Sequence, residues 1–435
     1  MTSSSLRAFA VVSAALNAAL LAGLILILVR TRGNDTSDAA GEMSEKSESW
    51  RQCDAAPSET LPVRNAEKTQ SKLYFSGSQR QQMYMNEGLL RFDKNEFEFA
   101  LVSDLDLKSR DPQRFRWFSY LKRGVLHRKT GHRDGGGSEY SVTWKETHTL
   151  ETFTAKKNRS MELSELVQFN HRLLAMCDYT GLVFKIDMKS SKSGREIENA
   201  PCAGVKQRSS NPSSSTVNVF QRYAIADGNG DKVKPCKMEW ATVKDGVLWV
   251  GSIGKEWTAT NAQGESVIVH RDPEWVKTID DSGRVQNYNW GAVYAALRTA
   301  TNTTFPGYLW HEAVHWDPRM RRWVFLPRKA SESDPYEPTA DERKGTNLLI
   351  FANEDFTDIN VLRVGGKDAA PADPERGFTA IRKVPGTAND FMALQVREVA
   401  EETATWILIF DGEGNVLLPP QLVASDVKFE GLEFI

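Results

Sequence analysis

The feature that most constrains the fold of this chain is a recurrent pattern of short strand-forming runs joined by tight turns. Runs rich in aromatic and β-branched residues alternate with turn signals such as Lys244 to Gly246 and Asp411 to Gly414. Such runs, separated by Gly- and Asp-containing turns, are the signature of β-hairpins. Only the segment from Trp290 to Ala300 has the composition of a helix of useful length. The sequence therefore predicts an all-β fold.

An acidic residue stands near the start of the first strand in several of these units. The spacing is loose, roughly 50 to 75 residues, and one interval of about twice that length contains Phe378 to Lys383, a similar first strand without the acid. The acids are Asp104, Glu162, Glu239, Glu312 and Glu430. A β-propeller places its innermost strands around a central channel. About five such units predict a five-bladed β-propeller, with these acids at one end of its channel.

Carboxylates that converge in this way repel one another unless a cation neutralises them. Oxygen ligands with little His or Cys nearby favour Ca²⁺, which accepts six to eight carboxylate, carbonyl and water oxygens. A single glutamate beside a strand is ordinarily a solvated surface residue. The recurrence of the acids is what predicts a central calcium site.

The N-terminal part of the chain differs in composition from the rest. After a short tail, residues 1–7, the run from Ala8 to Val29 carries no charge and is long enough to cross a bilayer as a helix. It predicts a transmembrane signal-anchor over 8–29, followed by a polar, flexible stem over 30–90. The folded domain is expected over 91–435, with a low-complexity surface insertion at 189–216. A cleaved signal peptide, which would give a secreted protein, is the alternative.

The position of the anchor, together with three glycosylation sequons, predicts that the folded domain lies in the lumen of the secretory pathway. The sequons begin at Asn34, Asn158 and Asn302. An oxidising lumen would permit disulfides among the cysteines, and Cys202 could pair with Cys177 or Cys236; buried unpaired cysteines are the alternative. The formal net charge of −2 gives no reason to expect a nucleic-acid partner.

Several ordered blocks of sequence resemble the calcium-activated nucleotidase family, the soluble apyrase type. Among them are "SDLD", "MELSEL", "MEWATVKDGVLWVGSIGKEWT", "PGYLWHE", "DERKGTNLL" and the terminal "FEGLEFI". The similarity covers about residues 95–435. The resemblance implies a five-bladed propeller with one calcium in its tunnel. It also implies calcium-dependent hydrolysis of nucleoside diphosphates, commonly UDP and GDP, and of triphosphates, to the monophosphate and phosphate in the endoplasmic reticulum or Golgi.

The same resemblance assigns calcium ligands to positions of this chain. It makes the side chains of Glu162, Glu239 and Glu430 ligands, adds main-chain oxygens, and places one aspartate at the metal or in its water shell. The main-chain donors are Ser103 and Ala313, and the aspartate is Asp104. The family has serine at the position of Ala313. If only the carbonyl binds, the change costs little; if the hydroxyl mattered, it would weaken metal binding. Glu312, the acid from the repeat, is then not itself a ligand.

The expected reaction is in-line attack of water on the terminal phosphorus, with the metal neutralising phosphate charge. Asp104 or Asp106 would position that water or accept its proton. Lys255 and Arg328 are candidate phosphate cations, with surface salt bridges as the alternative for both. Trp257 is a candidate for stacking on the base, as is Trp275, although Trp residues in a propeller more often pack in the core.

Two other classes of function compete with this interpretation. His311 and His315 match the H-E-x-x-H pattern of zinc proteases, but nearby prolines and flanking aromatic residues favour a strand. On a strand the two imidazoles would share one face about 13 Å apart, too far for one zinc. The second alternative is a non-catalytic, membrane-anchored calcium-binding propeller scaffold. The sequence is also compatible with a homodimer.

Overall fold

The computed structural model describes residues 95–130, 138–188, 217–400 and 402–435. The anchor predicted over 8–29, the stem over 30–90 and the insertion over 189–216 lie outside these ranges, as do Cys53 and Cys202. Within the described ranges, no helix is long and apolar enough to span a bilayer.

The described residues form five four-stranded antiparallel sheets, here called blades, each numbered by its order along the chain. Blade 1 contains β22 (Lys428–Phe434), β1 (Glu96–Asp104), β2 (Trp117–Thr130) and β3 (Ser138–Thr152). Blade 2 contains β4 (Leu163–Phe169), β5 (Arg172–Cys177), β6 (Leu182–Met188) and β7 (Val217–Ala224). Blade 3 contains β8 (Trp240–Lys244), β9 (Val247–Gly251), β12 (Trp275–Ile279) and β13 (Val285–Asn289).

Blade 4 contains β14 (Tyr308–Asp317), β15 (Arg322–Ser331), β16 (Leu348–Asn353) and β17 (Ile359–Arg363). Blade 5 contains β18 (Arg376–Lys383), β19 (Phe391–Val399), β20 (Glu402–Phe410) and β21 (Val416–Ala424). A two-stranded hairpin, β10 (Trp257–Thr260) with β11 (Ser266–His270), projects between β9 and β12. The remaining helical elements of the described ranges are α4 (Gly291–Ala300) and the 3-10 helices η3 (Asp106–Ser109), η4 (Asp272–Glu274) and η5 (Ala340–Arg343).

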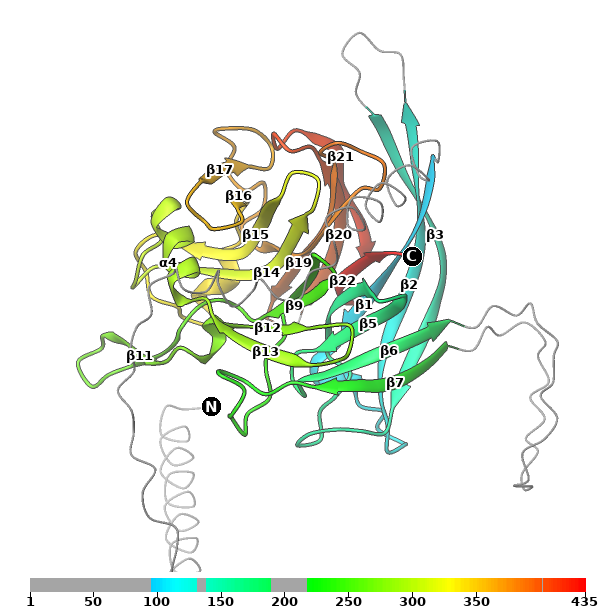
Figure 1. The fold of residues 1–435 in the computed structure, drawn as a ribbon, viewed down its shortest axis with the longest axis horizontal. Helices are drawn as coiled ribbons and strands as arrows, with labels where there is room; N and C mark the ends of the chain where they lie inside the picture. Colours follow the sequence, from blue (N-terminus) through cyan, green and yellow to red (C-terminus); the bar gives the residue numbers. More distant parts are fainter. Residues whose placement is uncertain (1–94, 131–137, 189–216, 401) are drawn as a thin grey trace, which may run out of the picture. The chain divides into compact units, whose positions relative to one another are not determined.

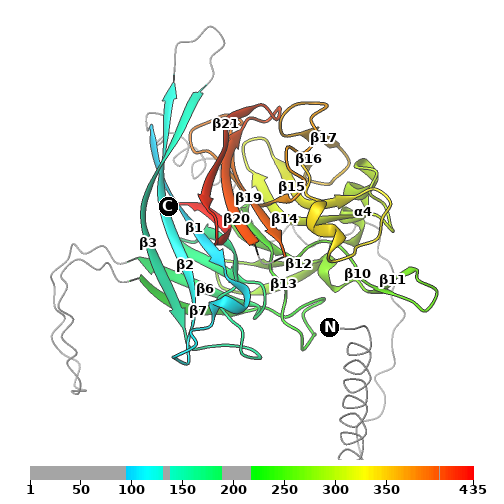
Figure 2. The same cartoon turned by 180° about the vertical axis from the view of Figure 1, so that it is seen from behind.

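The blades form a closed ring through their innermost strands. β22, β4, β8, β14 and β18 contact one another in that order, and β18 returns to contact β22. Figure 1 shows the strands of the blades arranged around a common centre. The ring closes because the last strand, β22, pairs with the first described strand, β1, inside one blade (Figure 2). The predicted all-β, five-bladed propeller is therefore confirmed, and Phe378 to Lys383 is the innermost strand of blade 5 as expected.

The hairpin turns follow from the residues at their corners. Asn170 and His171 have φ of 49° and 56°, and Asp245 and Gly246 have φ of 51° and 77°. Two consecutive residues with positive φ define the turn whose twist matches antiparallel strands, and Asn, Asp and Gly adopt this conformation at the lowest cost. Each turn lies where the sequence predicted it.

A β-bulge interrupts the innermost strand of several blades. The register skips Glu312 in β14, Thr379 in β18 and Glu430 in β22, so each is an extra residue opposite the neighbouring strand. Bulges change the direction in which a side chain points and are frequent next to functional sites. Thr379 stands where the repeat of the sequence lacks its acid.

The bulge at Glu312 also settles the geometry of the two histidines. Both lie on strand β14, as predicted, but the expectation that they share a face is wrong, because the extra residue reverses the alternation between them. His311 packs against Tyr294 and Phe325, whereas His315 packs against Phe391 of blade 5. The two imidazoles therefore face opposite sides of the blade and cannot bind one zinc ion.

Cys177 and Cys236 are buried free thiols. Burial raises the pKa of each to about 12, so both are inert at neutral pH. Cys202 lies outside the described residues, and of the two alternatives the structure shows Cys177 and Cys236 as unpaired buried cysteines.

Candidate functional site

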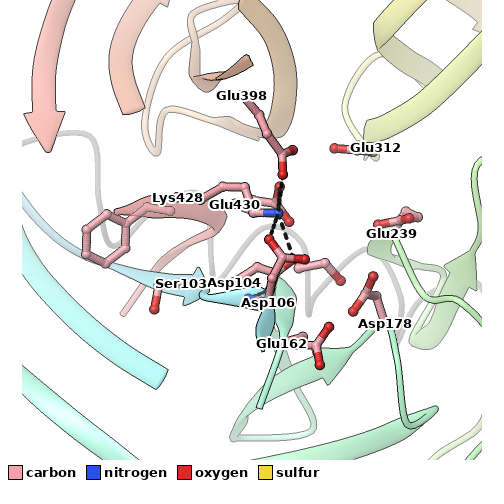
Figure 3. A network of polar contacts seen from close by, with 12 residues as sticks. Ser103, Asp104, Asp106, Glu162, Asp178, Glu239, Glu312, Glu398, Lys428 and Glu430 are labelled. Carbon is pink, nitrogen blue, oxygen red and sulfur yellow. Dashed lines mark hydrogen bonds and ion pairs between the residues drawn. The ribbon is translucent and has the colours of Figure 1, made fainter. Parts of the chain in front are cut away.

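A cavity of about 200 Å³ opens at the end of the ring where the innermost strands begin, and its wall is rich in carboxylates. Figure 3 shows these side chains converging from several blades. The acids that line it are Asp104, Asp106, Asp178, Glu239, Glu312, Glu398 and Glu430, with Glu162 beside them. The predicted convergence of the acids is therefore present.

The route by which the acids reach this cavity differs between blades. Glu162 and Glu239 directly precede the innermost strands β4 and β8, as predicted. Asp104 does not begin an innermost strand: it is the last residue of β1, and that part of the prediction is wrong. β1 runs antiparallel to β22, so Asp104 lies opposite Lys428 at the start of β22 and still reaches the same end.

The ammonium of Lys428 lies among four carboxylates (Figure 3). Its Nζ is 2.8 Å from a carboxylate oxygen of Asp106 and 3.1 Å from one of Asp104. The corresponding distances to Glu398 and Glu430 are 3.4 Å and 3.7 Å. Lys428 is itself buried. This one cation therefore offsets the repulsion among acids from blades 1 and 5.

Arg328 of β15 plays a similar part on the other side of the cavity. One terminal nitrogen lies 2.7 Å from Glu312 and 3.1 Å from Glu430, and the other lies 2.9 Å from Glu398. The planar guanidinium suits such multiple carboxylate contacts. Arg328 thus joins blade 4 to blades 1 and 5.

Two further cations complete the set of ion pairs. Lys237 lies 2.5 Å from both Asp178 and Glu239. Arg159 donates through two of its nitrogens to the two carboxylate oxygens of Glu162. Every predicted acidic ligand therefore has a cationic partner from this chain.

These partners do not fully compensate for burial. Burial, opposed by Arg159 and reinforced by the charge of Asp104, raises the pKa of Glu162 to about 7. Burial, opposed by Lys237, raises the pKa of Glu239 to about 8, and burial raises the pKa of Glu430 well above its usual range. Each upward shift of the pKa means that the ionised carboxylate is less stable in the folded protein than it is in water. The cavity can therefore accept additional positive charge.

The donor set suits a divalent cation that prefers oxygen. Carboxylate oxygens of Asp104, Asp106 and Glu162 all lie within 4.8 Å of one another, a spacing at which one ion can contact all three. Carboxylate and carbonyl oxygens are the ligands of calcium, with magnesium and manganese as related possibilities. Ser103 and Ala313, the predicted carbonyl donors, are fully buried next to Asp104 and Glu312 in sequence, and neither lines the cavity. The carbonyl of Ser103 already accepts a hydrogen bond of 2.7 Å from the hydroxyl of Ser119.

The predicted substrate residues divide into three groups. Arg328 lines the cavity. Lys255 is buried and does not line the cavity. Its Nζ lies 5.0 Å from the ring centroid of Tyr336, which does line it. Trp257 lies on the β10–β11 hairpin, where it is 46% exposed and stacks on His270, and it does not line the cavity. Trp275 begins β12 and does not line the cavity either.

Sequence reasoning missed several residues of this site. The missed members of the wall are Asp178, Lys237, Trp310, Lys329, Tyr336, Glu398 and Lys428. A signal for the cations was present in the sequence: Lys237 and Lys428 each stand two residues before a predicted acidic ligand. Arg159 stands three residues before Glu162. No comparable pattern marks Trp310, Tyr336 or Glu398.

Comparisons with known proteins give the family. The family model described as Apyrase matches residues 105–435. The soluble calcium-activated nucleotidase 1 of Rattus norvegicus is 37% identical over 341 residues, which cover 78% of this chain and 74% of that protein. The apyrase apy-1 of Caenorhabditis elegans is 34% identical over 83% of this chain and 92% of that protein. An apyrase of Phlebotomus duboscqi is 30% identical over 77% and 88% of the two chains. The chain belongs to the apyrase family.

Proposed function

We propose that this protein is a calcium-dependent hydrolase that converts nucleoside diphosphates, UDP and GDP before others, to the monophosphate and phosphate. The observation that carries the proposal is the convergence at one small cavity of buried carboxylates that lie in, or directly before, every innermost strand except β18. The raised pKa values of Glu162 and Glu239 support the binding of a further cation there. The names of the curated relatives, which include calcium-activated nucleotidase, support calcium and a nucleotide.

In this proposal Asp104, Glu162, Glu239 and Glu430 would hold the metal, together with the carbonyl oxygens of Ser103 and Ala313. When bound, the ion neutralises phosphate charge and orients the terminal phosphate. Glu312, whose carboxylate lies in the cavity wall, is held by Arg328 at 2.7 Å and by the indole N–H of Trp310 at 2.8 Å. These contacts favour a positioning role for Glu312.

The two aspartates of "SDLD" differ in their surroundings. Asp104 is buried, and its carboxylate accepts the backbone N–H of Asp106 at 2.8 Å, which fixes its orientation. The side chain of Asp106 is 46% exposed. We therefore assign the metal to Asp104 and the attacking water to Asp106. The water oxygen bonds to the terminal phosphorus, the bond to the bridging oxygen breaks, and Asp106 accepts the proton.

The phosphates also require cations from the chain. Arg328 is engaged by three carboxylates, so its main contribution is to hold them in place. Lys329, the next residue, lines the cavity and makes no ion pair with any described residue. Its ammonium is therefore the cation most available to the substrate, and it joins Arg328 and Lys255 as a candidate phosphate contact.

The test is a substrate panel on the full chain. We expect phosphate release from UDP and GDP in calcium and none in a calcium-selective chelator. Glu239→Gln should lower kcat/KM by about a hundredfold or more, a loss typical of residues that organise a catalytic metal. Glu354→Gln, a matched change at an exposed glutamate paired with Lys244 and Arg321, should leave activity intact. Full activity of Glu239→Gln would refute its assignment as a ligand.

We also propose that the catalytic domain lies in the lumen of the endoplasmic reticulum or Golgi, anchored through residues 8–29. The uncharged run of sequence supports the anchor, and the exposed Asn158 and Asn302 can accept glycans. A glycosidase-sensitive mass shift and protection from added protease in intact vesicles are expected. Degradation of the domain by added protease in sealed vesicles would contradict this location.

A calcium-binding scaffold without turnover is the less favoured function. Asp106, which is half-exposed beside the acidic cluster, and Lys329, which makes no ion pair with a described residue, supply the groups that hydrolysis needs. Calcium binding without turnover of any nucleotide in the same panel would favour the scaffold.

A further inference from the structure

The cavity is too small to enclose a whole nucleotide. Its volume is about 200 Å³, below the roughly 300–1,000 Å³ of clefts that bury most of a ligand's surface. The carboxylates and cations occupy its interior, so the phosphates belong there. The nucleobase of a bound substrate must therefore lie at the mouth, against side chains that are only half-buried.

Two aromatic side chains form the mouth on the blade 4 side. Trp310 of β14 and Tyr336, in the loop after β15, both line the cavity and are both half-exposed. Their ring centroids are 5.3 Å apart and their planes are inclined by 35°. Their partly exposed rings therefore lie directly beside the charged interior.

This aromatic pair is held rigidly. The indole N–H of Trp310 donates to Glu312 at 2.8 Å, and Glu312 is itself held by Arg328. The ammonium of Lys329 lies 5.8 Å from the ring centroid of Trp310. Tyr336 packs edge-on against the buried Tyr308 at 5.9 Å, and Lys255 lies 5.0 Å from its ring centroid. A platform fixed before binding loses little entropy when a ligand stacks on it.

We infer that Trp310 and Tyr336 are the nucleobase subsite of this enzyme. The inference rests on the proposed function and assigns the base of the nucleoside diphosphate to stacking at the mouth. Stacking selects for a planar ring with little regard to its identity, which suits an enzyme that accepts both pyrimidine and purine diphosphates. The link from Trp310 through Glu312 to Arg328 fixes the distance between base and phosphate subsites.

This subsite replaces the one suggested by the sequence. Trp257, the predicted stacking residue, already stacks on His270 at 6.1 Å, has Lys234 5.2 Å from its ring centroid, and lies outside the cavity wall. It therefore serves as a control tryptophan that is exposed but not at the mouth.

The test compares UDP with ribose 5-diphosphate, which has the same sugar and phosphates but no base. With the full chain in calcium, Trp310→Ala should raise KM for UDP roughly tenfold, the size of one base–aromatic stack. The ratio of kcat/KM for UDP to that for ribose 5-diphosphate should fall by the same factor. Trp310→Phe should restore most of the ratio, because it keeps an aromatic face, and Trp257→Ala should leave the ratio unchanged.

The outcomes distinguish a failure of the proposed base subsite from a failure of the proposed hydrolysis. An equal loss on both substrates in Trp310→Ala would overturn the base subsite and leave Trp310 a structural residue of the mouth. An unchanged ratio in both Trp310→Ala and Tyr336→Ala would also overturn it. If the unaltered protein hydrolyses neither substrate, the proposed function itself fails.

Discussion

At the scale of single residues, the site is a set of acid–cation pairs rather than an exposed acidic patch. The spacing K-x-E recurs, with Lys237 before Glu239 and Lys428 before Glu430. Charges that are taken out of water are tolerated when they are paired and hydrogen-bonded. The chain thereby folds around the cluster without depending on the metal for all of its neutralisation. The same pairing sets a limit on calcium affinity, because the resident cations repel the incoming ion.

A first prediction concerns Lys428. Replacing it with Met removes the cation nearest to Asp104 and Asp106, which also lies 3.7 Å from Glu430, and so strengthens the repulsion among these acids. We expect Lys428→Met to bind calcium about tenfold more tightly, or about 1.4 kcal/mol. In chelator it should unfold with a free energy lower by about 3 kcal/mol, as for a broken buried ion pair. Calorimetric titration with calcium and denaturant unfolding measure the two effects.

The control for this change is Lys244→Met, which removes a lysine paired with Asp245 and Glu354 in blade 3 and away from the cavity. It should leave calcium affinity unaltered. Weaker calcium binding by Lys428→Met would contradict the idea that this lysine competes with the metal.

A second prediction concerns the pH dependence of stability through Glu398. Burial alone would raise its pKa, but Lys428 and Arg328 outweigh burial and lower the pKa to about 2. A carboxyl whose folded pKa lies below the unfolded value of 4.5 stabilises the fold above pH 4.5. That contribution is lost as the pH falls from 4.5 toward 2. Because the side chain is 38% exposed, solvent screening reduces its contribution to about 1 kcal/mol.

The comparison of the unaltered chain with Glu398→Gln in chelator isolates this contribution. The difference in free energy of unfolding should be about 1 kcal/mol at pH 7 and should shrink by pH 3.5. Urea unfolding at pH 7, 5 and 3.5 measures it. A difference in free energy of unfolding that grows as the pH falls would contradict a lowered pKa of Glu398 in the folded state.

At the scale of elements, the approach of the innermost strands determines whether the acids meet. Gly431 lies in β22 where that strand passes β4, and a Cβ there would lie 2.7 Å from backbone atoms of Glu165 and Leu166. It would also lie 2.7 Å from a side-chain carbon of Val102. Backbone atoms cannot rotate away as a flexible side chain can. Glycine is required here for close packing of two strands.

A third prediction follows from this contact. Gly431→Ala should lower the free energy of unfolding by about 3 kcal/mol, the upper part of the range for overpacking. Because it displaces β22, it should also weaken calcium binding through Glu430. Gly412→Ala is the matched control, since its nearest neighbour is a side-chain atom of Asn389 at 3.1 Å. Equal stability of the two variants would mean that β22 can shift without cost.

The elements were largely predictable from the sequence, and the reasons are local. Turn residues such as Asn170 and Asp245 specify their hairpins without help from the rest of the chain. Bulges are different, because an extra residue is defined only relative to the partner strand. For that reason the sequence of β14 alone could not show on which side of the blade His311 and His315 each lie. The position of Asp104 could not be read from its own strand either, since only the pairing of β1 with β22 brings it to the cavity.

At the scale of the whole molecule, closure of the ring brings the site together. Asp104 and Glu430 are far apart in sequence, yet both lie near Lys428 because the last strand completes the first blade. The recurrence of acids in the sequence was enough to predict that they converge. Glu398 could not be predicted, because it lies one residue before the end of β19 and does not precede an innermost strand. The aromatic mouth was also unpredictable, since Trp310 and Tyr336 meet only across a loop.

The measurement that tests the central claim most directly is a calcium titration of the metal-free full chain, with UDP hydrolysis followed at each free calcium concentration. We expect one calcium ion bound per chain, phosphate release that rises in proportion to its occupancy, and strongly weakened calcium binding and phosphate release in Glu239→Gln. Phosphate release at full rate in chelator, or calcium binding that persists unchanged in Glu239→Gln, would contradict this expectation.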